Sequence, residues 1–193
     1  DPAWEYRVLA GPAGTSEDYA LAVIGTLLAG GKNSRLVTRL VEEEKLAHEG
    51  GVEIWNDARK YDGIFYVFVE GSQGADLRRI PEVMMEELDR LKRGKVPERE
   101  LERARNILYA STIFSREHSY NLAVDIARSE VLGLPDYFAT YVDKIRNVTP
   151  ENIVSVSQDL FLPEQFTVAY AEGGTEPAAG LGRGRPAGQR AAD

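Results

Sequence analysis

The sequence contains no cysteine among its 193 residues. A disulfide-stapled scaffold and a thiolate metal site are therefore both excluded. Catalysis by a cysteine nucleophile is excluded for the same reason. The absence of cysteine does not indicate whether the protein works in an oxidising or a reducing compartment, because only proteins that depend on disulfides need an oxidising one.

Histidine is almost as scarce, since the chain has only His48 and His118. Two histidines that bind zinc from one helix lie three or four residues apart, whereas these two lie far apart in the chain. His48-Glu49 matches the start of a His-Glu-x-x-His zinc motif, but Val52 stands where the second histidine would be. The sequence thus predicts no metal site and no cofactor within this chain.

Long apolar runs and an excess of basic residues are also missing. The net charge is −8, which argues against a nucleic-acid partner because phosphate contacts need a basic surface. The longest apolar stretch, Tyr19–Ala29, is interrupted by Gly25 and Thr26 and is shorter than the roughly 18–20 residues that cross a bilayer. We expect no membrane span and a soluble protein. A bacterial cytoplasm or periplasm fits the sequence, which does not choose between them.

Motifs for self-contained catalysis are absent. No Gly-x-Ser-x-Gly elbow occurs, and neither Gly30 nor Gly71–Gly74 is followed by the Lys-Ser/Thr of a phosphate loop. The remaining hydroxyl side chains considered as nucleophiles are Ser34, Ser119 and Thr149. Each stands where a helix cap is expected. Because the chain also begins Asp1-Pro2-Ala3 without a methionine, we expect a piece of a longer, partner-dependent protein.

Four segments have the composition of β-strands. They are Trp4–Ala10, Val52–Trp55, Ile64–Val69 and Gln165–Ala171. Ile64–Val69 is apolar throughout, which predicts a central strand buried on both faces. With Val52–Trp55 it is expected to form a hairpin across the turn-like stretch Asp57–Gly63.

Helical periodicity and cap residues fill most of the remaining chain. A helix capped by Ser16 and ended by Gly30 is apolar nearly all round, which predicts a place deep in the core. A short helix follows Ser34, and its acidic run Glu42–Glu44 is expected to be solvated. Further helices are expected over Asp76–Lys92, from Pro97 to a break at Ser115–Ser119, over Asn121–Gly133, from Pro135, and from Thr149 to Leu160. The buried face of the first of these is predicted at Leu77, Ile80, Met84, Leu88 and Leu91, and that of the second at Leu101, Ala104, Leu108 and Ser111.

The order of elements predicts an α+β fold. Strands clustered apart from helices indicate a largely antiparallel mixed sheet with helices packed mainly on one face. Residues 1–173 are expected to form this domain. Residues 174–193 are rich in Gly, Ala, Pro and Arg, a composition that buries too little apolar surface and predicts a flexible tail.

One stretch carries a family resemblance. Gly30-Gly31, Ser34-Arg35-Leu36, Leu40, Glu42-Glu43 and Leu46-Ala47 together resemble the pitrilysin/insulinase-type zinc metallopeptidases. In that family a Gly-Gly-x-x-Ser-Arg-Leu segment runs into Leu-Arg-Glu-Glu-x-x-Leu-Ala-Tyr. Further matches follow in order at Asp62-Gly63, Val96-Pro97, Leu132–Pro135, Val148–Glu151 and Leu162–Glu164. The resemblance extends from Trp4 to about Gly173.

The resemblance implies a domain that works in a pair. In this family, homologous α+β domains enclose a chamber, and one of them binds zinc through an inverted His-x-x-Glu-His motif. This chain is similar to the other one, the metal-free second domain of a zinc metalloendopeptidase. The resemblance therefore implies that the chain alone is inactive and has no catalytic residue of its own. The implied partners are a zinc-bearing domain, in the same polypeptide or a separate subunit, a peptide substrate, and a second copy in a dimer.

The resemblance also points to substrate-binding positions. Active members present an Arg and a Tyr, seven residues apart, that hold the peptide; these positions correspond to Val41 and His48. Val41 cannot donate a hydrogen bond, whereas His48 can replace a tyrosine as a donor. The family's strand edge for the substrate backbone corresponds to Gly50–Asn56, from which the expected contacts are Gly50, Gly51, Val52, Glu53 and Ile54.

Two alternatives of other classes remain open at this stage. The same fold serves as catalytically inactive scaffold or assembly subunits, and the loss of the Arg/Tyr pair favours this interpretation. A third interpretation is an autonomous peptide-binding module.

Overall fold

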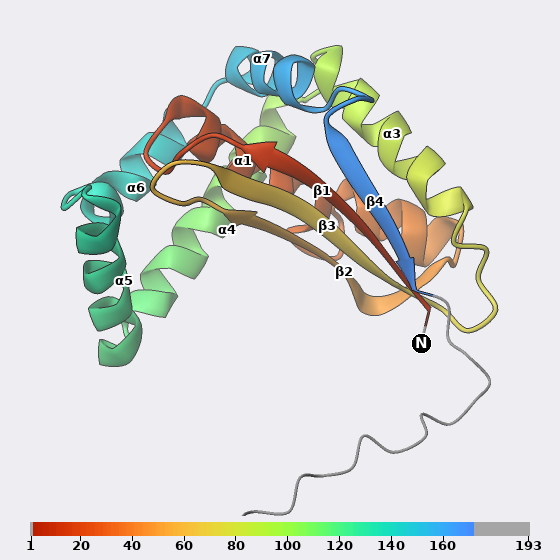
Figure 1. Ribbon diagram of the computed structural model, residues 1–193, viewed down its shortest axis with the longest axis horizontal. Helices are drawn as coiled ribbons and strands as arrows, with labels where there is room; N and C mark the ends of the chain where they lie inside the picture. The colour runs from red at the N-terminus through yellow and green to blue at the C-terminus, as the bar shows by residue number, and fades with distance from the viewer. Residues whose placement is uncertain (1, 172–193) are drawn as a thin grey trace, which may run out of the picture.

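Within residues 2–171, four antiparallel strands form a single sheet in the order β2-β3-β1-β4. The computed structural model describes residues 2–171, and the tail expected over residues 174–193 lies outside that range. The strands are β1 (Ala3–Ala10), β2 (Ala47–Asp57), β3 (Gly63–Gly71) and β4 (Phe166–Ala171). Figure 1 shows the sheet as a twisted layer, with α5 (Ser119–Leu132) at one end of the molecule, apart from the strands. The α+β class is confirmed, and every strand pair is antiparallel.

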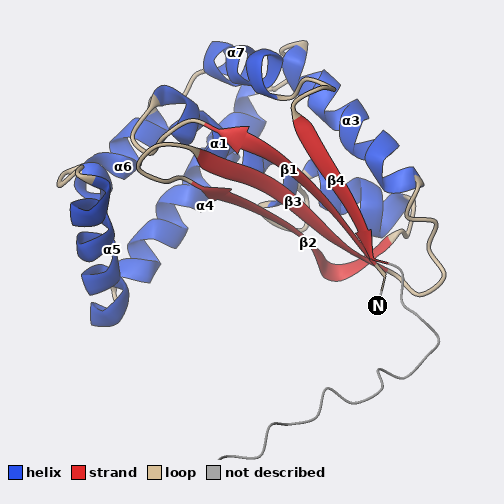
Figure 2. Cartoon of the chain, viewed as in Figure 1, coloured by secondary structure: helices blue, strands red, loops and turns tan. Residues whose placement is uncertain are grey.

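Helices gather on one face of this sheet (Figure 2). They are α1 (Ser16–Ala29), α2 (Arg35–Val37), the π-helix η1 (Thr38–Glu43), α3 (Arg79–Lys92), α4 (Glu98–Arg116), α5 (Ser119–Leu132), α6 (Tyr137–Arg146) and α7 (Pro150–Leu160). Helix α1 is largely buried, as its apolar sequence predicts. No helix within residues 2–171 combines the length and the apolar character that a bilayer crossing needs.

The two faces of the sheet differ in burial. On the helix-covered face, Trp4, Tyr6, Phe65 and Val67 are almost completely buried. The alternate residues of β3 are only partly covered, as its alternating burial pattern records. The prediction that Ile64–Val69 is buried on both faces is therefore wrong. Its outward side chains lie on the face that no helix of residues 2–171 covers (Figure 2), and there Tyr66 stacks on Trp55 of β2 with ring centroids 4.9 Å apart.

Strand β2 is more than twice as long as predicted. It begins at Ala47 rather than Val52, and it pairs with β3 through Asp57. The register shifts between Ala47 and Val52, because a β-bulge separates the two paired segments. Glycines in this bulge hid the strand from the sequence pattern, although the predicted hairpin itself is confirmed.

Several helix limits differ by one or a few residues from the sequence-based expectation. Thr15, not Ser16, caps α1, since its hydroxyl accepts a 3.3 Å hydrogen bond from the Asp18 amide. Gly133 ends α5 at φ 72°, a left-handed cap that glycine adopts without strain. Ser111 is exposed, so the predicted buried face of α4 stops short of it. The predicted face of α3 is confirmed throughout.

Candidate functional site

The predicted substrate-binding segment lies on an edge strand. Strand β2 ends the sheet order, so only its β3 side is paired within residues 2–171. Gly50 takes a left-handed φ of 85° in the bulge. A Cβ atom on Gly51 would lie only 2.7 Å from the carbonyl oxygen of Glu70. Both positions therefore need glycine for the bulge to form.

His48 lies at the start of this strand with its side chain 48% exposed. Its Nε2 atom is 3.4 Å from a carboxylate oxygen of Glu70 on the neighbouring strand. The imidazole is thus reachable from solvent and oriented by one acidic neighbour. It retains the hydrogen-bonding capacity expected from the sequence.

Val41 lies in a different environment. It belongs to η1, where it is partly buried and packs against the hydrophobic core. Leu40 of η1 and Leu36 of the preceding α2 are fully buried. Val41 therefore offers no polar group beside His48.

A groove borders the far half of β2. It has a volume of about 280 Å³ and lies between β2, helix α1 and residues of α4 and α6. On the α1 side its lining residues include Ala22, Gly25 and Ala29, and on the strand side Ile54–Asn56. A Cβ on Gly25 would lie 3.2 Å from Cγ2 of Ile54, so small residues on α1 allow the helix to approach the strand. The sequence did not predict this groove, although Ala22, Gly25 and Ala29 of α1 recur at helical spacing.

Asp18 fixes the end of the strand that lines this groove. Its carboxylate accepts hydrogen bonds from Asn56 Nδ2 at 2.8 Å, from the Tyr137 hydroxyl at 2.7 Å and from the Gly14 amide at 2.9 Å. Burial and the adjacent Asp18 charge raise the pKa of Tyr137, which keeps the hydroxyl protonated as a donor. Asp18 thus joins the first turn of α1 to two distant segments, the end of β2 and α6, and to the loop before α1.

An ion-pair cluster attaches η1 to α3. Arg39 contacts Glu44, Glu86 and Glu87 at 2.9–3.2 Å, and Arg79 contacts Glu44 at 2.8 Å. The hydrogen bond from Arg79 leads the causes that lower the pKa of Glu44. The acidic run Glu42–Glu44 was predicted to be solvated, and this holds for its first two residues but not for Glu44.

The lowered pKa of Glu44 predicts an acid dependence of stability. Its ion pairs stabilise the fold at pH values above the ordinary glutamate pKa of 4.5, and this contribution is lost as the pH falls through the lower pKa of the folded state. We expect Glu44→Gln to remove about 0.5–1 kcal/mol of unfolding free energy at pH 7 and almost none at pH 3. Urea unfolding at both pH values measures the loss of unfolding free energy. An equal loss at both would show that the carboxylate charge is not the cause.

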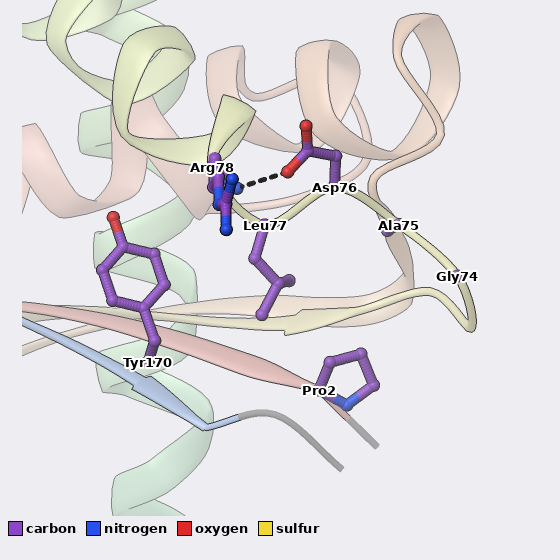
Figure 3. A pocket seen from close by; sticks show the side chains of 7 residues that line it. All are labelled: Pro2, Gly74, Ala75, Asp76, Leu77, Arg78 and Tyr170. Atoms are coloured by element: carbon purple, nitrogen blue, oxygen red, sulfur yellow. Dashed lines mark hydrogen bonds between the residues drawn. The ribbon is translucent and has the colours of Figure 1, made fainter.

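A depression larger than this groove lies elsewhere on the surface (Figure 3). It has a volume of about 740 Å³ and is lined by Pro2, residues 74–78 and Tyr170. Within it, the Arg78 amide donates a 3.0 Å hydrogen bond to the Asp76 carboxylate. None of the predicted site residues lines this depression, and its charged side chains form no catalytic arrangement. We therefore place the candidate site at β2 and its groove.

The described part of the chain contains no cluster of three or more His, Cys, Asp or Glu side chains that fits a metal ion. His118 precedes α5 and is exposed. The residues present thus do not fit a zinc ion in this domain.

Comparison with known proteins gives a consistent result. A family model described as the peptidase M16 inactive domain matches residues 2–108. An uncharacterized zinc protease of Streptomyces coelicolor is 27% identical over 74% of this chain and 30% of its own length. The zinc protease PqqE of Helicobacter pylori is 23% identical over 80% of this chain and 34% of its own. The chain thus spans about a third of the length of these relatives.

Solved structures show the same fold at low sequence identity. A protease from Helicobacter pylori superposes with a TM-score of 0.81 at 20% identity, over 89% of this chain and 41% of that one. An inactive peptidase domain from Bordetella parapertussis superposes with a TM-score of 0.77 at 19% identity, over 89% of this chain and 92% of that one. A domain of this size has therefore been solved by itself.

Proposed function

Because this chain belongs to the peptidase M16 inactive-domain family, we propose that it is the domain that binds the peptide substrate for a zinc-bearing partner domain. The partner supplies a zinc-activated water for hydrolysis. This chain closes the chamber and holds the substrate backbone in an extended conformation. It takes no part itself in bond cleavage.

The free edge of β2 beside an apolar groove carries this proposal. An edge strand offers unpaired N–H and C=O groups to which an extended peptide can add as a further strand. Side chains of such a peptide alternate between the two faces. Those on the helix side enter the groove bordered by Ile54–Asn56, and its small lining residues leave room for an apolar side chain.

His48 provides a second contact in this proposal. Its exposed imidazole lies at the other end of β2 from the groove, so it can donate a hydrogen bond to a peptide carbonyl. The glycines at positions 50 and 51 remove side chains between the two contacts. The peptide backbone can therefore approach the strand closely there.

The alternative is a catalytically inactive scaffold of the same fold. The observation that favours it is the packing of Val41 against the core, since no cationic group replaces the arginine expected at that position. In a scaffold the β2 edge binds no substrate. A substitution that fills the groove should change peptide hydrolysis if the domain binds substrate. It should have no such effect if the domain is a scaffold.

The test combines this chain with the zinc-bearing domain of its parent protein and measures hydrolysis of oxidised insulin B chain. We expect activity on mixing that neither part has alone. Ala29→Leu places an isobutyl group in the groove and should lower kcat/KM roughly tenfold, the effect of losing about 1.4 kcal/mol of peptide binding. The matched control is Asn106→Leu, which adds the same side chain at an exposed position of α4.

The outcomes separate the two functions. No activity on mixing contradicts the peptidase proposal and supports the scaffold. If mixing gives activity and neither Ala29→Leu nor Asn106→Leu changes it, the peptidase proposal stands. The groove is then not part of the peptide-binding site.

A further inference from the structure

The groove between α1 and β2 is apolar except for a few polar side chains along its wall. The ring of Trp55 lies on the uncovered face of the sheet, so the polar side chains that line the groove are those of Thr26, Asn56 and Tyr141. The Thr26 hydroxyl donates a 3.0 Å hydrogen bond to the carbonyl of Ala22 within its own helix. Asn56 and Tyr141 therefore decide which polar groups the groove offers to a ligand.

The Asn56 side chain is held in one orientation. Its Nδ2 atom donates hydrogen bonds to the Asp18 carboxylate at 2.8 Å and to the Asp18 carbonyl at 3.1 Å. Turning the amide over would place its oxygen against these two acceptors, so Oδ1 points away from Asp18. This Oδ1 atom is buried and has no hydrogen-bond partner among the described residues. A buried acceptor without a donor is costly, so a ligand that supplies an N–H group gains a hydrogen bond without breaking another.

The Tyr141 hydroxyl is a second unused polar group in the groove. The Asp18 carboxylate accepts its hydroxyl hydrogen bond from Tyr137 instead, and within residues 2–171 no other residue accepts one from Tyr141. Burial and then the Asp18 charge raise the pKa of Tyr141, so its hydroxyl stays protonated as a donor. Both Asn56 and Tyr141 thus lie near Asp18, and together they give this end of the groove one acceptor and one donor.

We propose that this end of the groove binds the carboxamide of a glutamine side chain of the peptide substrate. The glutamine NH₂ group donates to Oδ1 of Asn56, and the glutamine carbonyl accepts from the Tyr141 hydroxyl. Among neutral side chains, only asparagine and glutamine carry this donor and this acceptor on separate atoms of one planar group. The two methylene groups of glutamine suit the small apolar wall formed by Ala22 and Gly25 of α1. The inference rests on the proposed function, because addition of the peptide to the β2 edge brings its side chain into the groove.

Two side chains of nearly the same shape as glutamine define the specificity. Methionine would fill the same space but would leave both polar groups of the groove without partners. Glutamate has no N–H group for Asn56, and its charge would lie near the Asp18 carboxylate. The loss of two neutral hydrogen bonds corresponds to roughly tenfold or more in affinity, so glutamine should be preferred over both by at least this factor.

Titration of the ¹⁵N-labelled 193-residue chain with short peptides, followed by NMR, tests the proposal. The peptides are acetyl-Thr-Val-Xaa-Val-Thr-amide, with glutamine, methionine or glutamate as Xaa. The glutamine peptide should bind at least about tenfold more tightly than the other two and should shift the side-chain NH₂ signals of Asn56. Tyr141→Phe should weaken binding of the glutamine peptide about three- to tenfold and leave that of the methionine peptide unchanged. The matched control is Tyr109→Phe, which removes the same hydroxyl from an α4 residue outside the groove.

Hydrolysis of the same peptides and of oxidised insulin B chain by the mixed enzyme separates this inference from the proposed function. A preference for glutamine in binding, without hydrolysis of any substrate on mixing, supports the carboxamide site and contradicts the peptidase. Hydrolysis of insulin B chain, with equal dissociation constants for the glutamine and methionine peptides, keeps the peptidase and overturns the carboxamide site. A preference that Tyr141→Phe does not reduce overturns the carboxamide site as well, and so does the absence of binding by all three peptides.

Discussion

Replacing Glu87 with alanine is expected to lower the free energy of unfolding by about 3–5 kcal/mol, the cost of removing one partner from a buried ion pair. The Glu87 side chain is only 1% exposed. One carboxylate oxygen lies 2.8 Å from Arg90 and 3.1 Å from Arg39, and the other lies 3.9 Å from Arg35. Alanine would leave these guanidinium groups facing a cavity without the buried negative charge.

The adjacent residue provides a matched control for this prediction. Glu86 also contacts Arg39, at 2.9 Å, but its side chain is 50% exposed. Its replacement by alanine should cost less than about 1 kcal/mol, as for other surface ion pairs. Urea unfolding measures both variants. A Glu87→Ala protein as stable as Glu86→Ala would show that the buried carboxylate contributes no more than a surface one.

The sequence contained a signal for Glu87 that the apolar pattern concealed. Ile80, Met84 and Leu91 lie on the predicted buried face of α3, and position 87 continues their spacing of three and four residues. An acidic residue within an apolar stripe indicates a buried pair. Its partners could not be identified beforehand, because Arg39 and Arg35 reach it only after η1 packs against α3.

Local patterns predicted most of the fold. Cap residues and helical periodicity located the helices, because these signals act within one or two turns. The predicted start of α7 at Thr149-Pro150 is confirmed, with Thr149 and Asn152 forming a reciprocal capping pair. The antiparallel sheet followed from the clustering of strands apart from helices.

Features that depend on distant segments were not predictable. Residues Ile64–Val69 of β3 are apolar throughout, and only the folded sheet shows that alternate residues of this run are partly exposed. The bulge of β2 requires close approach of Gly51 to Glu70, so its glycines look like a loop in the sequence. The family resemblance predicted substrate-binding positions on β2, but it did not predict the groove, which depends on the approach of α1 to β2.

Replacing Asp18 with alanine is expected to lower the free energy of unfolding by about 3 kcal/mol. The reason is that the buried hydrogen-bond donors to its carboxylate would be left without an acceptor. Asp18 is 2% exposed, and its carboxylate receives the Tyr137 hydroxyl, the Asn56 amide and the Gly14 backbone amide. These donors come from α6, the end of β2 and the loop before α1, so the loss is shared by two contacts between distant segments and one local contact.

A double-mutant cycle with Tyr137→Phe isolates one of these contacts. Tyr137→Phe removes the hydroxyl but keeps the ring, so it should cost only about 1 kcal/mol by itself. In the absence of Asp18 the same change should cost nothing, or should stabilise slightly, because the hydroxyl has lost its acceptor. Additive effects of the two substitutions in urea unfolding would contradict the contact.

Asn56 borders the groove, so Asp18→Ala should also weaken peptide hydrolysis by the mixed enzyme. Tyr137→Phe keeps the hydrogen bond between Asp18 and Asn56, and it should leave hydrolysis nearly unchanged.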